Sequence, residues 1–136
     1  MPDPDPQLTT DADVLVRVPA DGAFVSVLRT TTAGLAARLD FTLDVVEDLR
    51  IAVGEACAMV LPVADPAGDM TAEFFLGRGS LRVVVSVTCA EPILPDYDSF
   101  AWQVLQTLAD HAEATQRGGR FAVTVSLVAE EHPAGA

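Results

Sequence analysis

Residues 42–61 read TLDVVEDLRIAVGEACAMVL and contain apolar residues spaced three and four positions apart. This spacing places them on one face of a helix, which we expect to be buried. Thr42 is a suitable N-cap, and the helix should end before Pro62, because a residue that precedes proline disfavours the helical conformation. The predicted buried stripe consists of Val46, Leu49, Val53, Ala56 and Val60.

A second periodic segment lies upstream and predicts an earlier helix that begins at Asp21, a plausible cap. We expect Arg29 to point away from its apolar stripe. That stripe consists of Phe24, Leu28, Thr31, Leu35 and Leu39.

Strands are predicted on both sides of these helices, at 14–18, 71–76, 81–89 and 121–127. The turn at 77–80 makes the middle two strands an antiparallel hairpin. A third helix should begin at Asp98 or Ser99, carry apolar residues as far as Ala112, and be broken by Gly118 and Gly119. The expected fold is therefore α+β, a two-layer sandwich of three helices on a mixed, mostly antiparallel sheet.

Length and composition limit the function classes. The chain has 136 residues, which suits one domain at 13–129, between a disordered tail at 1–12 and a second tail at 130–136. Its formal net charge is −12, which argues against direct nucleic-acid binding. All basic residues are arginines, so there is no lysine for a Walker A motif or a Schiff base.

Location and metal binding are inferred from what the sequence lacks. It has neither a basic, apolar leader nor a long apolar run, so we expect a cytoplasmic protein without a membrane segment. With two cysteines and two histidines, we expect no metal site. Cys57 and Cys89 are expected to be buried structural thiols, and a redox switch stays open as the alternative.

The stretch Val25 to Leu61 resembles the first two helices of the anti-sigma factor serine-protein kinases of the RsbW and SpoIIAB type. These are members of the GHKL superfamily of ATP-binding domains, which share the Bergerat-like fold. The matching features are Arg29, the run DLRIAV at 48–53, and Glu55-Ala56-Cys57. Residues 99–110 also resemble actinobacterial anti-sigma factors of the sigma-F type, which share a poor nucleotide site.

The resemblance implies an ATP site whose catalytic glutamate is Glu55. The family's Mg²⁺-binding asparagine corresponds to Met59, and a thioether is a poor ligand for this hard cation. Ser99 and Ala101 stand where the family has glycines that let the backbone approach phosphate. The expected pocket positions Glu55, Met59, Ser99 and Ala101 therefore describe a degenerate site, for which ATP and Mg²⁺ are doubtful cofactors.

The remaining implication is regulation of transcription, as in stress responses, by protein binding. We expect a homodimeric anti-sigma factor that sequesters a sigma factor and contacts it through Arg29. It releases the sigma factor when an anti-anti-sigma partner of the STAS fold competes for binding. One alternative is an active kinase that uses ATP and Glu55 to phosphorylate that partner. Another is a pocket that senses a different small ligand. From the residues alone, the pattern favours a solvated acid on the flank of a helix for Glu55.

Overall fold

The computed structural model describes residues 11–91 and 95–129. The predicted tails lie outside these residues, apart from positions 11 and 12. The helices are α1 (Val25–Arg38), α2 (Leu43–Val60) and α3 (Phe100–Leu108), with short 3-10 turns η1 (Gly22–Phe24) and η2 (Leu61–Val63). The strands are β1 (Val14–Pro19), β2 (Asp69–Gly77), β3 (Ser80–Thr88), β4 (His111–Arg117) and β5 (Arg120–Val128).

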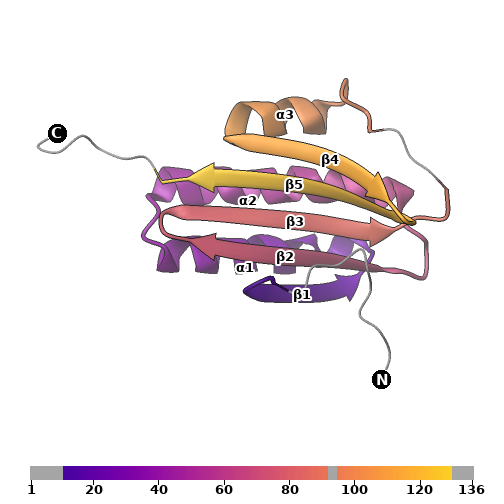
Figure 1. Ribbon diagram of the computed structural model, residues 1–136, viewed down its shortest axis with the longest axis horizontal. Helices are drawn as coiled ribbons and strands as arrows, with labels where there is room; N and C mark the ends of the chain where they lie inside the picture. Colours follow the sequence, from indigo (N-terminus) through magenta and orange to yellow (C-terminus); the bar gives the residue numbers. More distant parts are fainter. Residues whose placement is uncertain (1–10, 92–94, 130–136) are drawn as a thin grey trace, which may run out of the picture.

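The strands form one five-stranded sheet in the order β1-β2-β3-β5-β4, and the helices lie against one of its faces (Figure 1). The predicted α+β two-layer sandwich is confirmed, and it is consistent with a GHKL-like fold. The expected mixture of strand directions is wrong, because all four strand pairings are antiparallel. Two consecutive helices separate β1 from β2, so this connection is not the single-helix crossover that joins parallel strands.

Helix α2 follows the predicted pattern closely. The Thr42 hydroxyl accepts a hydrogen bond from the Val45 amide at 3.3 Å, as an N-cap should. The helix ends at Val60, and Pro62 lies in the following 3-10 turn. Leu49, Ala52, Val53, Ala56, Cys57 and Val60 are all fully buried, so α2 forms the centre of the helical layer.

Helix α1 is buried along a different line from the one predicted. Asp21 caps the 3-10 turn that precedes the helix, by accepting from the Ala23 amide at 2.9 Å. Beside Leu28, the buried residues are Thr32 and Ala36, whereas Thr31 and Leu35 are only half-buried. Thr32 tolerates burial because its hydroxyl donates to the carbonyl of Leu28 at 2.7 Å.

Alternating residues of the central strands fill the space beneath α2. Leu81, Val83, Val85 and Val87 are fully buried on β3, as the alternation predicts. Of the two adjacent phenylalanines on β2, Phe74 is fully buried and Phe75 is half-buried on the opposite face. No helix within the described ranges has both the length and the apolar character that a bilayer crossing requires.

The predicted third helix is too long, because it continues into residues that form β4. Helix α3 ends at Leu108, and Ala109 has an extended conformation. Residues 111–117 then pair with β5 through a turn at Gly118 and Gly119, whose φ angles of 56° and 81° suit glycine. The sequence HAEATQR has helix-favouring alanines, glutamate and glutamine, so pairing with β5 overrides local propensity here.

Candidate functional site

Helix α2 carries Glu55 and Met59, which are one turn apart and half-buried. Residues four positions apart on a helix project in similar directions, so the family's base and metal-ligand positions were expected to face one pocket. Among the described residues, the Glu55 side chain has no hydrogen bond or ion pair, and it does not line the cavity that Met59 enters. The structure therefore places the two side chains in different surroundings.

Met59, Ser99 and Ala101 line one cavity of about 250 Å³ between the end of α2, the start of α3 and the start of β5. These are three of the four positions that the family resemblance assigned to the pocket, and Glu55 is the fourth. The other described lining residues are Ala58, Pro62, Val63, Pro95, Asp96 and Phe121. This lining is mostly apolar.

Ser99 has a structural role at this cavity. Its hydroxyl accepts a hydrogen bond from the Trp102 amide at 3.2 Å and donates to the Asp96 carbonyl at 2.9 Å. It is therefore the N-cap of α3, and it uses a backbone amide that a phosphate would need. Trp102 packs edge-to-face against Tyr97, with ring centroids 4.9 Å apart, which agrees with a packing role.

The described residues of this cavity do not fit a magnesium nucleotide. The cavity is smaller than the roughly 300–1,000 Å³ of typical ligand pockets. Its one charged lining side chain among the described residues is Asp96, whose carboxylate would repel phosphate. Met59 offers sulfur where Mg²⁺ prefers oxygen.

Arg29 was expected to point away from the apolar stripe of α1. Its side chain does not extend into solvent but crosses from α1 to α2. Its Cδ and Nε atoms lie 3.5 Å and 3.8 Å from the position that a Cβ atom on Gly54 would occupy. The Nε atom is buried and has no hydrogen-bond partner among the described residues. An unpaired buried donor costs about 1–3 kcal/mol, so this placement of the Arg29 side chain is unfavourable for the isolated protein.

The two cysteines are free and buried, as predicted. Burial raises the pKa of the Cys57 thiol to about 12, although the charge of Arg29 acts in the opposite direction. A thiol with a raised pKa has little of the thiolate form that reacts with oxidants. This environment disfavours the redox-switch alternative at Cys57.

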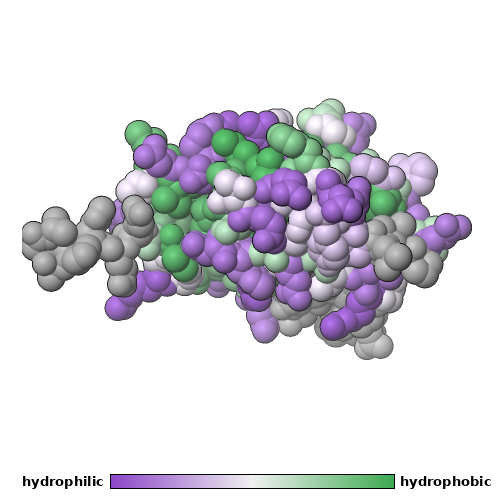
Figure 2. Space-filling view, turned by 90° about the horizontal axis from the view of Figure 1, so that it is seen from above, coloured by the Kyte–Doolittle hydropathy of each residue, from purple (hydrophilic) through white to green (hydrophobic). Residues whose placement is uncertain are grey.

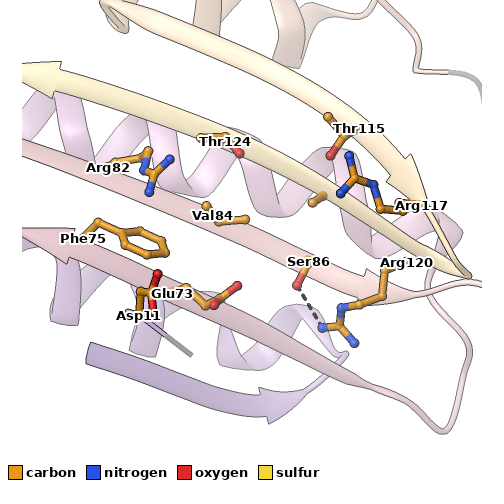
Figure 3. A pocket seen from close by; sticks show the side chains of 11 residues that line it. Asp11, Glu73, Phe75, Arg82, Val84, Ser86, Thr115, Arg117, Arg120 and Thr124 are labelled. Atoms are coloured by element: carbon orange, nitrogen blue, oxygen red, sulfur yellow. Dashed lines mark hydrogen bonds between the residues drawn. The ribbon is translucent and has the colours of Figure 1, made fainter. Parts of the chain in front are cut away.

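A second hollow, of about 360 Å³, lies on the face of the sheet that the helices do not cover (Figure 3). Three arginines line it: Arg82, Arg117 and Arg120. Arg120 is 8% exposed and donates to the Ser86 hydroxyl at 2.9 Å, while the Arg82 guanidinium lies 4.1 Å from the centre of the Phe75 ring.

No local sequence pattern groups these three arginines, because only the strand register brings them together. Asp11 and Glu73 line the same hollow, so its charges are close to balance. It is therefore not a strongly cationic anion site.

Hydrophobic residues also reach the surface beside α3. Figure 2 shows them among hydrophilic residues on the side of the molecule where α3 lies. Phe100, the first residue of α3, is 78% exposed. The predicted apolar stripe of this helix is therefore only partly buried.

Comparison with known proteins gives consistent matches. The chain is 43% identical over 70 residues to "Serine-protein kinase RsbW" of Halalkalibacterium halodurans, a match that covers 51% of this chain and 43% of that protein. It is 35% identical over 83 residues to the protein of the same name from Bacillus subtilis, covering 58% and 52%. A third, from Bacillus cereus, is 34% identical over 73 residues, covering 52% and 46%.

These matches have a limited extent. The chain spans about half the length of the curated relatives it matches. No family model matches it. The chain is thus similar in sequence, over part of its length, to proteins named serine-protein kinase RsbW.

Proposed function

Because the chain is related by sequence to the RsbW serine-protein kinases and anti-sigma factors, we propose that it is an anti-sigma factor that works by sequestration and without ATP. It binds an alternative sigma factor, keeps it from RNA polymerase core, and gives it up when an anti-anti-sigma protein of the STAS fold competes. We place this activity in the cytoplasm, where these partners act.

The observation that carries this proposal is the position of Arg29. Its guanidinium is already held at the α1–α2 surface, and its buried Nε–H lacks a partner among the described residues. Arg29 as a whole is only half-buried, so the terminal N–H groups of its guanidinium could donate to a carboxylate of a protein partner. Ile51, one turn before Gly54 on α2, is 39% exposed, so an apolar contact is available on the same side of the helix.

Charge supports the choice of partner. The formal net charge of −12 attracts a basic, DNA-binding protein such as a sigma factor. Steering of this kind raises the association rate and weakens with salt. We expect the association rate to fall as ionic strength rises, whereas contacts at Arg29 chiefly determine dissociation.

The test is co-purification with each sigma factor of the host, followed by titration with variants. Arg29→Ala and Arg29→Glu should weaken sigma-factor binding at least tenfold. Arg78→Ala is the control, because Arg78 is exposed in the turn between β2 and β3. Equal losses for Arg29 and Arg78, or no sigma factor bound by the wild type, would contradict the proposal.

The second candidate function is an active serine-protein kinase that uses ATP and Glu55. The similarity to proteins named serine-protein kinase RsbW favours it, and the small apolar cavity opposes it. Calorimetric titration with Mg²⁺-ATP separates the two, with a nucleotide-binding kinase of the family as positive control. Micromolar binding would make the kinase the leading function, and no detectable heat at several temperatures would support sequestration.

We further propose that the protein acts as a homodimer through the helix-free face of the sheet. Phe75 is half-buried there, and Leu15, which pairs with Glu73 on β2, is 45% exposed. Light scattering should give a dimer mass for the wild type and a monomer mass for Leu15→Glu. Leu43→Glu, on the helical layer, is the control that should stay dimeric.

A further inference from the structure

We propose that Gly54 is a positioning residue, which leaves open the space on α2 in which the Arg29 side chain lies. The consequence for partner binding rests on the function proposed above, whereas the packing of the two residues does not. A glycine inside a helix is ordinarily less favourable than alanine, because it loses more backbone freedom on folding. The sequence pattern alone gives no reason for a glycine at position 54.

The space over Gly54 is filled by Arg29. Within 4 Å of the position of an added Cβ atom, apart from atoms of its chain neighbours and its own helix backbone, lie the Arg29 Cδ atom at 3.5 Å and its Nε atom at 3.8 Å. Gly34 on α1 differs, because its added Cβ would have no atom within 4 Å. Gly54 is therefore the glycine at which a side chain would compete with an arginine.

The distances predict how substitutions at position 54 should rank. A Cβ atom at 3.5 Å makes an ordinary van der Waals contact, so alanine fits without moving Arg29. Valine has two γ carbons, and in a helix it is largely restricted to one rotamer, so rotation cannot carry both away from Arg29. Valine should therefore push the guanidinium off α2 and expose its Nε–H to solvent.

A second observation locates the guanidinium on the same side of α2. Cys57 lies three residues after Gly54, a spacing that puts the two on one helix face. The charge of Arg29 acts on the Cys57 thiol and favours its ionised form. The guanidinium therefore lies close enough to Cys57 for its charge to act on the thiol, while the Arg29 Cδ and Nε atoms lie over Gly54.

The experiment measures the exchange of the Arg29 side-chain Nε–H by NMR in the wild type, Gly54→Ala and Gly54→Val. We expect slow exchange in the wild type and in Gly54→Ala. In Gly54→Val the exchange rate should be at least tenfold higher. Gly34→Val is the matched control for adding the same side chain to an open helical position, and it should leave the exchange rate unchanged. An unchanged rate in Gly54→Val would overturn the proposal.

A double-mutant cycle then tests the link to binding, with the host sigma factor as the ligand. Gly54→Val should weaken binding about as much as Arg29→Ala, and Gly54→Ala should stay within twofold of the wild type. In an Arg29→Ala background, Gly54→Val should cause no further loss, since it acts through the arginine. A loss of equal size in both backgrounds would overturn the positioning role.

The two proposals fail separately. If the wild type binds no sigma factor, the proposed function fails, and the exchange measurement alone decides whether Gly54 positions Arg29. Circular dichroism melts of each variant verify folding. Gly54→Ser, which adds one atom beyond alanine, provides an intermediate step if the valine variant does not fold.

Discussion

The Ser99 hydroxyl gives the sharpest test of whether this position belongs to a helix cap or to a ligand site. In Ser99→Ala the hydroxyl loses its bond from the Trp102 amide at 3.2 Å and its bond to the Asp96 carbonyl at 2.9 Å. Replacing a serine N-cap by alanine costs about 1 kcal/mol, whereas glycine costs only a few tenths. We therefore expect Ser99→Gly to be milder than Ser99→Ala.

Urea unfolding followed by circular dichroism measures the difference, with the midpoint compared at constant slope. For a chain of this size, about 1 kcal/mol corresponds to a shift in Tm of roughly 3–5 °C. Ser99→Asp, which retains a capping oxygen, should stay close to the wild type. A fully stable Ser99→Ala, or a Ser99→Gly that is less stable than Ser99→Ala, would refute the cap assignment.

Three further predictions concern the core, a thiol and the turns. Leu49→Ala removes a fully buried side chain from the centre of α2 and should lower the free energy of unfolding by about 2–5 kcal/mol in urea titration; a loss below 1 kcal/mol would contradict the placement of α2. Because burial raises the pKa of Cys57 from 9.0 to about 12, the unfolded chain ionises first, so stability should fall between these pH values. The difference in the free energy of unfolding between the wild type and Cys57→Ala should decrease over that pH range. A constant difference would be inconsistent with the raised pKa. Gly119→Ala should lower the free energy of unfolding by about 1–2 kcal/mol because of the φ angle of 81°. Gly34→Ala should raise it by about 0.5–1 kcal/mol, since the added methyl group has open space. Equal changes in Tm for the two variants in thermal melts would argue against the turn geometry.

The elements with strong periodic patterns could be predicted from sequence. Helix α2 has a capping threonine, a continuous apolar stripe and a terminating proline, and each of these signals acts within a few residues. The β2–β3 hairpin likewise follows from alternation around a glycine-containing turn. Signals within a few residues of one another were therefore sufficient to predict both elements.

The missed features depend on contacts between distant residues. Strand β4 has a helix-favouring composition, and it becomes a strand because β5 offers it a row of backbone partners. Burial on α1 shifts to Thr32 and Ala36 because the orientation of α1 against α2 is set by side-chain packing. The contact between Arg29 and Gly54 joins residues 25 positions apart, so no local pattern predicts it.

The resemblance grouped four positions of the candidate site. Met59, Ser99 and Ala101 line one cavity, whereas Glu55 does not line it. What the sequence could not give is the size and lining of the cavity. These depend on how residues from α2, the segment before α3, and β5 fill the space together.

The polar composition of β4 has a consequence for the protein at high concentration. β4 is an outer strand of the sheet, and its outward side chains include His111, Glu113 and Arg117, all exposed. Charged groups along an outer strand discourage a second chain from adding its own strand there. The polar, helix-favouring composition that prevents the prediction of β4 as a strand thus protects that edge of the sheet from aggregation.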